Sequence, residues 1–473
     1  MKVTTRFLCA LGVCAAACKP AADSQQTAKS TTIVLGQLVD RTGSIATPSW
    51  PESIRLAVGH VNQALKQSGK PLRFEIAEVN SGNAPDMSRV GALQLVKQQG
   101  AKAVITDSSQ DDIAVNMLNY DGDVSHQLEV PIVCMACTSP AIDNPEAKDA
   151  DPVKQAALRN GKGWNFRTTM SDAYQARMLV QMLVSAGQRG DVNGDGRFKL
   201  SIYASDDPYG HGFSDAIKGD ALKAHPGAII EQVFHDVKAN PNEYDWAGDV
   251  AKVTDKKNHG KPDALPDAIV EITFPKFSVG FTKAYLASGS KVRLVHAHNF
   301  RAARIIETLK AAVEGQEGTS QAVLGEGASG QAFADDLKAA SGQLPAFRDA
   351  AAYDATMTVM LAALHAAQRK HMADPSKVSG VDIRDSMRAI NDAQGEGVGA
   401  GAAGVSRAVE LIAAGKAIDY QGASGPCNYD PQGDIVAQLS RFQVRDGRFV
   451  DVDKFDCLKD PWCPQVQARA EKQ

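Results

Sequence analysis

The sequence predicts an α/β protein made of two similar lobes, each containing a doubly wound parallel sheet. From residue 31 onward, short apolar runs alternate with segments in which apolar residues recur every three or four positions. This alternation is typical of strand–helix–strand units with helices on both faces of a parallel sheet. The chain has 473 residues, and its units are too many for one small sheet, so we expect two lobes.

The predicted elements follow one another at short intervals. Residues 32–38 form an apolar run that ends at the turn 40–43, and a helix is expected from Pro51, with Ser49 placed to cap it. Further strands are expected at residues 72–79, 103–106, 130–134, 198–204, 228–234, 268–273 and 292–296. Further helices are expected at residues 87–99, 173–186, 213–225 and 275–288.

The ends of these strands predict where a ligand binds. Open parallel sheets bind ligands beyond the carboxyl ends of their strands, where the strand order reverses. One cleft should therefore collect the loops at residues 40–44, 106–110, 134–139, 205–209 and 273–276. These loops are rich in Ser, Thr and Gly and carry few charges, which suits a small polar ligand held by hydroxyls and backbone amides.

The N-terminus is typical of an exported protein. Lys2 and Arg6 precede the short apolar run 7–17, which ends in small residues, as in a secretory signal peptide. Cys18 follows three alanines and resembles the cysteine of a bacterial lipobox, although that motif prefers Leu where Ala15 stands. The resemblance implies lipidation of Cys18 as the first mature residue, and two or more acyl chains would anchor the protein to a membrane. A plain secretory peptide cleaved after residue 17 is the alternative.

The rest of the chain shows no other membrane or nucleic-acid signal. Residues 19–30 contain no large apolar side chain, so we expect a flexible tether. No later stretch approaches the about 20 apolar residues of a membrane span. The formal net charge is −4 and there is no basic tract, which argues against nucleic acid as a partner.

Five cysteines follow Cys18, and export makes disulfides permissible. They are Cys134, Cys137, Cys427, Cys457 and Cys463. Cys457 and Cys463 bracket a short tail that a disulfide would close. Cys134 and Cys137 form a Cys-x-x-Cys pair; redox or metal chemistry is one interpretation, but no second pair or His cluster lies nearby, so a structural role is preferred and no metal is expected. An odd number leaves at least one thiol free or bonded to another chain.

Several motifs in a fixed order resemble one protein family. They are Ile33-Val34-Leu35-Gly36 with Thr42-Gly43, Phe166-Arg167-Thr168 with Asp172 and Gln175, Asp206-Asp207-Pro208-Tyr209-Gly210, Ala352-Tyr353-Asp354-Ala355, and residues 420–426 with 429–434. Between about residues 31 and 452 the chain resembles the type I periplasmic binding proteins, in the branch of leucine/isoleucine/valine receptors of ABC transporters. The resemblance implies two lobes joined by a three-segment hinge, with crossings near residues 165, 296 and 422.

This resemblance implies a domain plan and a function. The expected parts are a signal peptide at 1–17, a lipidated tether at 18–30, lobe 1 at 31–165 and 297–422, lobe 2 at 166–296 and 423–455, and a tail at 456–473. The implied function is that of a substrate-binding lipoprotein of an ABC-type uptake system, facing the periplasm, with a permease as partner. It closes on a small polar ligand, an amino acid or a related amide or acid, without a cofactor. A sensor or envelope regulator that uses the same fold to bind a protein partner is the alternative.

The family's ligand-binding positions fall on specific residues here. The serines that hold the ligand carboxylate match Ser108 and Ser109, and the loop after the next strand matches Ala136, Cys137 and Thr138. The aromatic residue of the second lobe matches Phe274, which a core role would also explain. Tyr209 is expected near the cleft mouth.

Two positions depart from the family pattern. The acidic residue that pairs with the ligand's ammonium group falls at His298, and the aromatic residue of the first lobe falls at Ala46, whose space Trp50 can fill. A histidine removes the expected partner of an ammonium group, so the sequence places an ordinary α-amino acid in doubt and leaves an acid, amide or peptide-like ligand open.

Three other patterns have a functional and a structural interpretation. Residues 191–196 have the spacing of the first half of a calcium loop, but Ile202 stands where the closing Glu belongs, which favours a solvated turn. His296 and His298 flank Ala297 at the end of a strand, and a role of His298 in lining the cleft is preferred to a shared metal. Ser108, Ser109 and Cys137 lack a Gly-x-Ser-x-Gly elbow and partner residues placed by motif, so we expect no enzyme.

Overall fold

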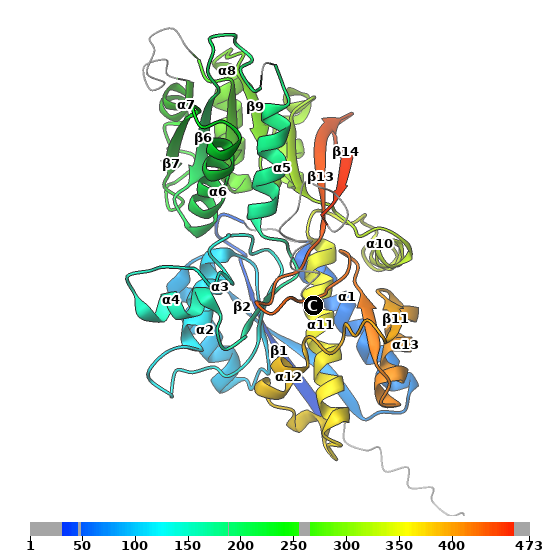
Figure 1. The fold of residues 1–473 in the computed structure, drawn as a ribbon. Coiled ribbons are helices and arrows are strands. Elements are labelled where there is room, and N and C mark those ends of the chain that lie inside the picture. Colours follow the sequence, from blue (N-terminus) through cyan, green and yellow to red (C-terminus); the bar gives the residue numbers. More distant parts are fainter. Residues whose placement is uncertain (1–30, 46–48, 188, 255–264, 458–473) are drawn as a thin grey trace, which may run out of the picture.

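The computed structural model consists of two lobes, one above the other in Figure 1. It describes residues 31–45, 49–187, 189–254 and 265–457. The predicted signal peptide, Cys18, the tether, Ala46, Cys463 and most of the predicted tail lie outside the described residues. Within the described ranges, no helix has both the length and the apolar character that crossing a membrane requires.

The first lobe contains a five-stranded parallel sheet in the order β2-β1-β3-β4-β5. Its strands are β1 (Thr31–Val39), β2 (Leu72–Asn80), β3 (Val104–Thr106), β4 (Ile132–Cys134) and β5 (Asn165–Arg167). Both faces are covered, because Ile33 and Leu35 of β1 join one buried cluster while Leu38 joins another on the opposite face. The predicted doubly wound arrangement is confirmed in this lobe.

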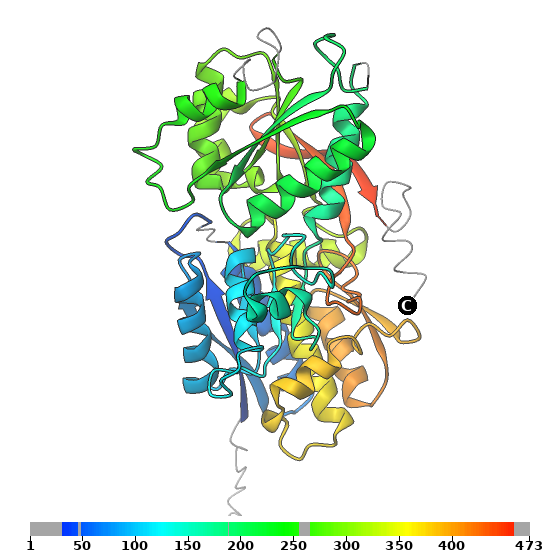
Figure 2. The same ribbon diagram turned by 60° about the vertical axis from the view of Figure 1, so that its left-hand side comes forward.

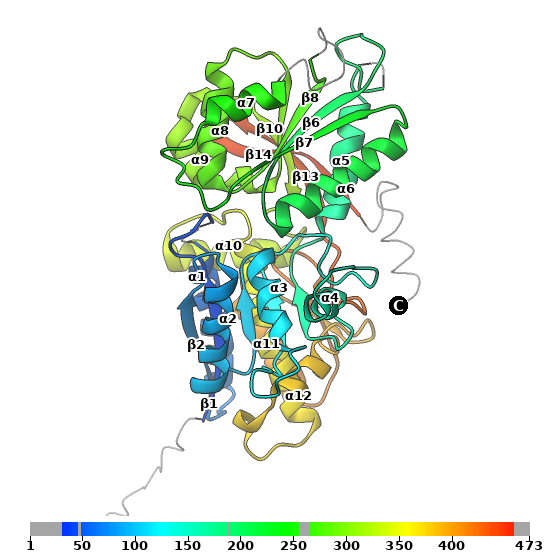
Figure 3. The same cartoon turned by 90° about the vertical axis from the view of Figure 1, so that its left-hand side faces the viewer.

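Helices of the first lobe pack in two layers. α1 contacts α11 and α13, and α2 contacts α3. Figure 3 shows α2 and α3 side by side. The helices are α1 (Trp50–Gln67), α2 (Pro85–Leu93), which continues into η1 (Gln94–Gln98), α3 (Ser109–Leu118), α4 (Pro152–Arg159), α10 (Ala328–Ser341), α11 (Asp349–Arg369), η5 (Pro375–Lys377), α12 (Gly380–Ser386) and α13 (Ala402–Ala413). A small parallel pair, β11 (Glu396–Gly399) and β12 (Ile418–Gln421), completes the lobe. Ser49 precedes α1, but its side chain forms no capping hydrogen bond, so that expectation is wrong.

The second lobe contains a seven-stranded sheet in the order β14-β13-β10-β9-β8-β6-β7. The parallel strands are β6 (Lys199–Ser205), β7 (Ile229–His235), β8 (Ala268–Ile272), β9 (Arg293–His296) and β10 (Glu317–Gln321). β13 (Gln438–Arg445) and β14 (Arg448–Asp456) extend it antiparallel at one edge, where Figure 2 shows them in red. The sheet is therefore mixed rather than wholly parallel.

The helices of the second lobe lie on both sides of this sheet. α5 contacts α6, and α8 contacts both α7 and α9. The helices are α5 (Asp172–Val184), α6 (Pro208–Ala224), α7 (Trp246–Thr254), α8 (Pro275–Ala287), η3 (His298–Arg301), α9 (Ala303–Leu309) and η4 (Lys310–Val313).

The second crossing between the lobes lies later in the chain than residue 296. β10 pairs with β9 and β13, so the chain stays in the second sheet through Gln321 and then passes to α10 of the first lobe. The expected crossing near residue 296 is therefore wrong. The sequence Glu-Gly-Thr-Ser-Gln of β10 contains no large apolar side chain, so it has no apolar pattern that predicts a strand.

The third crossing is held by a buried aspartate of α11. Both carboxylate oxygens of Asp354 accept hydrogen bonds from β12 and the segment after it. The donors are the Tyr420 hydroxyl of β12, the Ala423 N–H and the Ser424 N–H and hydroxyl, at 2.6–2.8 Å. A Cβ atom on Gly422 would lie 2.5 Å from this carboxylate. The chain then continues to β13 in the other lobe.

α6 begins five residues earlier than the sequence predicts. The Asp207 side chain caps the helix by accepting the Gly210 N–H at 2.9 Å, and Pro208 occupies the first helical position. Gly210 and Gly212 are typical of a turn, but here they lie in the helix and allow neighbouring segments to pack closely against it. A Cβ atom on Gly210 would lie 2.0 Å from the Ser205 carbonyl oxygen. The early start places Tyr209 in the first turn of α6.

The segment at residues 191–196 forms a hydrogen-bonded turn. The Asp191 carboxylate accepts the N–H groups of Gly194, Asp195 and Gly196. Asp267 accepts those of Val192 and Asn193. The carboxylates of Asp191 and Asp267 therefore accept hydrogen bonds from the backbone of the turn.

Candidate functional site

A small cavity lies between the two lobes and is lined by both. In this arrangement the cavity is nearly closed, with a free volume of about 10 Å³, roughly the space of one water molecule. The first lobe contributes Ile45, Trp50, Asp107, Ser108, Ser109, Ala136 and Arg348, and the second contributes Tyr209, Phe274, His298 and Asn299. The structure thus brings together seven of the nine residues that the sequence analysis assigned to ligand binding.

Two serines form one wall, at the carboxyl end of β3. The Ser108 hydroxyl oxygen caps α3 by accepting the Asp111 N–H at 3.2 Å. The Ser109 hydroxyl oxygen accepts the Ser139 N–H, also at 3.2 Å. Each hydroxyl uses its oxygen in the fold and keeps a hydrogen that can be donated to a ligand.

The loop after β4 forms the adjoining wall. Cys134 and Cys137 are joined by a disulfide, and only Ala136 between them lines the cavity. The Cys137 side chain is turned away, because it packs with Ile113, Ile142 and Leu158 in a separate apolar cluster. The resemblance implies that Cys137 lines the cavity, and in the structure it does not.

Thr138 lies next in this loop and is 5% exposed. It is not among the lining residues, but its hydroxyl oxygen has no hydrogen-bond partner in the described part of the chain. The hydroxyl is close enough to the Asp172 carboxyl to lower its pKa, without a well-formed hydrogen bond between them.

Aromatic rings from the second lobe face the serines. The Tyr209 ring centroid lies 5.5 Å from that of Phe274 and 5.2 Å from that of His298. The Tyr209 hydroxyl has no hydrogen-bond partner among the described residues, although burial would normally require one. Trp50, from the first lobe, donates its indole N–H to the Phe347 carbonyl at 3.1 Å and presents its ring to the cavity.

His298 is buried and neutral. Gln175 donates its amide N–H to the Thr319 carbonyl at 2.7 Å, so its oxygen faces His298 Nδ1 at 2.9 Å and accepts a hydrogen bond from it. This tautomer leaves Nε2 as an acceptor, and Nε2 has no partner among the described residues. Burial holds the pKa of His298 well below its ordinary value, and the nearby Arg348 charge lowers it further.

An acid that the sequence analysis did not assign to the site lies beside His298. The Asp172 carboxylate is 3.4 Å from His298 Nδ1, and neither of its oxygens takes part in a hydrogen bond within the described ranges. Burial raises the pKa of Asp172 well above its ordinary value, against the smaller effects of Thr138 and Arg348. The cleft therefore contains a carboxyl group, although not at the position that the family pattern indicates.

Arg348 is the other residue that the sequence analysis missed. It immediately precedes α11, and its guanidinium donates to the Ala136 carbonyl at 2.7 Å, across 212 positions of sequence. Burial lowers the pKa of Arg348 to about 10. Its φ of 71° lies in the left-handed region, which is costly for a residue with a side chain. A cation at a helix N-terminus is also unfavourable, and this is the one sequence signal that marks the residue.

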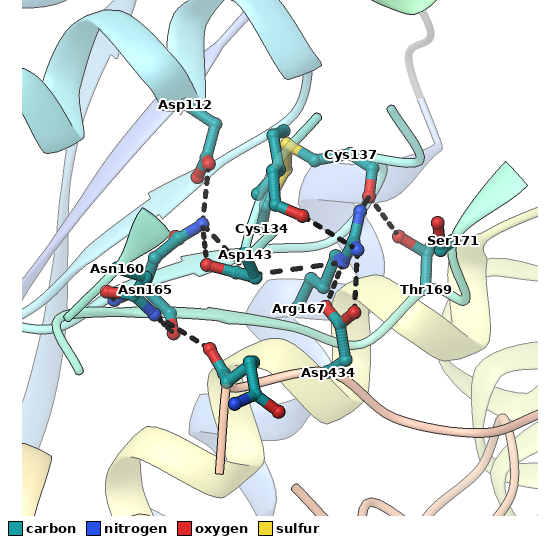
Figure 4. Close-up of polar contacts among 12 residues, drawn as sticks. Asp112, Cys134, Cys137, Asp143, Asn160, Asn165, Arg167, Thr169, Ser171 and Asp434 are labelled. Atoms are coloured by element: carbon teal, nitrogen blue, oxygen red, sulfur yellow. Dashed lines mark hydrogen bonds and ion pairs between the residues drawn. A yellow bond between two sulfur atoms is a disulfide. The ribbon is translucent and has the colours of Figure 1, made fainter. Parts of the chain in front are cut away.

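A buried network fixes the loop after β4 to the segments that connect the lobes (Figure 4). Arg167 forms a two-pronged ion pair with Asp434 of the third crossing and donates to the carbonyls of Cys137 and Ser139. Thr169 of the first crossing also donates to the Cys137 carbonyl, at 3.1 Å. The loop that lines the cavity is thus connected directly to two of the three crossings.

The same region contains the Asp112, Cys134 and Cys137 side chains, whose ligand atoms lie within 4.8 Å of one another. These residues do not fit a metal site. The sulfurs are bonded to each other, and the two oxygens of Asp112 accept hydrogen bonds from Thr106 and Asn165. The Cys-x-x-Cys motif is a structural disulfide here.

Two further cysteines have defined states. Cys427 is buried and free, and Cys457 is disulfide-bonded. Cys463, the partner that the sequence analysis considered for Cys457, lies outside the described residues.

Comparison with known proteins decides the family. The family described as periplasmic binding protein matches residues 32–447. This chain belongs to that family. The resemblance noted in the sequence is thereby confirmed, and the two-lobed α/β fold agrees with it.

Solved structures of other periplasmic binding proteins have the same fold. A leucine-binding protein, LivK, from Thermotoga maritima is 16% identical, with a TM-score of 0.63 over 90% of this chain and 99% of its own. An ABC transporter solute-binding protein from R. palustris in complex with benzoate is 15% identical, with a TM-score of 0.64 over 90% and 96%. A branched-chain amino acid ABC transporter protein from Thermus thermophilus with bound valine is 12% identical, with a TM-score of 0.63 over 93% and 100%. No curated protein matches this sequence significantly.

Proposed function

We propose that this periplasmic binding protein is the substrate-binding lipoprotein of an ABC-type uptake system. It closes on a small polar ligand, an amino acid or a related amide or acid, and delivers it unchanged to a permease. Lipidation of Cys18 tethers it to a membrane of the cell envelope, facing the periplasm.

The observation that carries this proposal is the cavity between the lobes. Polar atoms of Thr138, Asp172, Tyr209, His298 and Arg348 lie at or beside it, buried and without hydrogen-bond partners in the described part of the chain. Each unsatisfied buried polar group costs about 1–3 kcal/mol, and a ligand that pairs with several of them recovers this cost. A ligand with higher affinity for the closed form than for the open one is what drives hinge closure.

The ligand class is supported by the related structures. Solved structures with the same fold hold valine, isoleucine or benzoate, which share a carboxylate and an apolar body.

A thermal-shift screen of amino acids, amides and small acids tests the proposal. A ligand at 100 times its dissociation constant should stabilise the folded protein by about 2.7 kcal/mol, and should be recovered unchanged after incubation. If no compound raises the melting temperature, the solute-binding function is contradicted.

Mass spectrometry of the N-terminal peptide of the mature protein, after extraction of the protein from membranes, tests whether Cys18 is lipidated. The alternative outcome is an unmodified N-terminus produced by cleavage after residue 17.

A further inference from the structure

Arg348 is a buried cation without a counter-ion among the described residues. It is 7% exposed, and no carboxylate lies within ion-pair distance of its guanidinium in the described ranges. Its Nε has no hydrogen-bond partner there, which is also true of Arg301 Nε, so the missing counter-ion is what sets Arg348 apart. Burying a charge without a partner costs several kcal/mol, so natural sites pair such a group or reserve it for a ligand.

Arg301 shows how the same protein treats a structural arginine. It is 6% exposed, and its guanidinium forms an ion pair with Asp451 at 2.6 Å and hydrogen bonds with the hydroxyls of Ser320 and Ser440. Arg348 has one hydrogen bond, to a carbonyl, a contact with the Phe347 ring at 5.0 Å from its centroid, and a strained backbone. Strain of this kind persists at functional sites where the surrounding structure enforces it.

The carboxyl groups nearest to Arg348 do not neutralise it. Asp107 accepts the Asp40 N–H at 2.7 Å, and Asp172 lies against His298. Burial raises the pKa of both carboxyls well above the ordinary value, which favours their uncharged forms. With His298 neutral, Arg348 is the one charged basic group among the described residues that line the cavity.

The remaining groups are arranged for an oxyanion on one side and an uncharged body on the other. The hydroxyls of Ser108 and Ser109 are on the same wall as Arg348 and can donate to a carboxylate. The opposite wall presents the rings of Tyr209 and Phe274 and the neutral acceptor of His298. Among the described residues, the carboxyl group beside this wall is that of Asp172, and burial raises its pKa, which disfavours the charged form that an ammonium group would pair with.

We propose that the ligand is a small monocarboxylate without an ammonium group, and that Arg348 is the residue that selects its carboxylate. This inference deepens the proposed function and rests on it. The serine hydroxyls complete the carboxylate site, and the aromatic wall packs against the body of the ligand.

Isosteric compounds test the inference by titration calorimetry on the mature protein. The probes are 4-methylpentanoate, its primary amide and leucine, which share one carbon skeleton, together with benzoate and benzamide. A carboxylate should bind, and its amide should bind at least about 10-fold more weakly, because a hydrogen bond to a charged group is lost. Leucine should also bind more weakly than 4-methylpentanoate.

Amides or leucine that bind as tightly as the matching carboxylates contradict this inference and leave the proposed function intact. A panel in which acids, amides and amino acids all fail to bind contradicts the proposed function itself. The two failures are thus distinguishable.

Arg348→Met provides a test that does not depend on the ligand. Removing an unpaired buried cation should leave the melting temperature of the ligand-free protein unchanged or higher, and should abolish discrimination between acid and amide. Arg301→Met is the matched control, and it should lower the melting temperature, because Asp451 loses its partner, while binding persists. If Arg348→Met unfolds as readily as Arg301→Met and the acid–amide preference survives, Arg348 is a structural residue and the inference is wrong.

Discussion

Thr138 holds a buried hydroxyl without a well-formed hydrogen bond among the described residues. It lies at the end of the β4 loop beside Asp172, with no hydrogen-bond partner among the described residues. We expect Thr138→Val, which replaces the hydroxyl by a methyl group, to weaken the best ligand by about 10-fold and to leave the melting temperature unchanged or slightly raised. Calorimetric titration and thermal unfolding of the same preparation measure both.

Thr356→Val is the control for this substitution. The Thr356 hydroxyl is also buried, but it donates to the Ala352 carbonyl inside α11. Its loss should affect stability and not ligand affinity. Unchanged binding by Thr138→Val would place the polar end of the ligand elsewhere in the cavity.

Asp112 should make stability depend on pH. Its folded-state pKa is raised by burial from 3.8 to about 7, and its oxygens accept hydrogen bonds from Thr106 and Asn165. Between about pH 4 and pH 7 the unfolded chain releases this proton and the folded protein keeps it, so the free energy of unfolding falls as the pH rises, by at most about 1.4 kcal/mol per pH unit. Above pH 7 the contribution is constant.

Asp112→Asn isolates this effect, because an amide does not titrate. In urea unfolding between pH 4 and pH 8, the variant should gain stability relative to the wild type as the pH rises to 7, and the difference should then level off. Loss of the Asn165 hydrogen bond shifts the variant by a constant amount and does not alter this trend. A difference independent of pH would show that Asp112 is ionised throughout.

At the scale of elements, the disulfide between Cys134 and Cys137 constrains the loop whose Ala136 carbonyl holds Arg348. Without the bond the loop has more conformations to lose on binding, so affinity should fall several-fold. We expect the reductant dithiothreitol to weaken binding by the wild type and to leave the already weaker Cys134→Ser/Cys137→Ser variant unaffected. The double variant is needed because Cys457 is also disulfide-bonded. Equal affinities for wild type and variant would show that the hydrogen bonds of Arg167 and Thr169 hold the loop by themselves.

The sequence predicts an element correctly where its own residue pattern specifies the secondary structure, and fails where pairing with distant strands specifies it. The apolar runs of β1, β6 and β8 are buried on both faces and are evident from composition alone. β10 has no such run, and it is a strand because β9 and β13 lie on either side of it, which is why the second crossing was misplaced. In α6, Asp207 and Pro208 signal the start of a helix, but the two glycines that follow are typical of a turn, so the sequence predicts a later start.

The same distinction applies to the site. Motif order located the serines, the β4 loop and the aromatic wall, because these residues follow strands at fixed positions. Arg348 belongs to no motif, and Asp172 belongs to the motif with Phe166 and Gln175, whose residues the family pattern does not assign to the ligand. They join the cavity only through the fold, which brings Arg348 to Ala136 and Asp172 to His298.

The whole molecule is described in an arrangement in which the lobes touch across the cavity. The Ser139 hydroxyl of the first lobe donates to the Pro208 carbonyl of the second at 2.7 Å. Gly212, one turn further along α6, faces the same loop, and a Cβ atom on it would lie 2.7 Å from Ser139 Oγ and 2.9 Å from Pro140 Cδ. The serine side chain can rotate, but the proline ring cannot yield easily, so close approach of the lobes depends on this glycine.

Gly212→Val should therefore hold the lobes apart. We expect small-angle scattering of the wild type to show compaction on addition of the best ligand, and the variant to remain extended and to bind at least 10-fold more weakly, since it loses the contacts made by the second lobe. Gly219→Val lies in the same helix with no atom within 4 Å of the added Cβ, so it carries the same helix-propensity cost without the steric block and should close normally. If Gly212→Val compacts like Gly219→Val, the lobes meet differently in the ligand-bound protein, and the cavity described between Ser109 and Tyr209 is not the place where the ligand is enclosed.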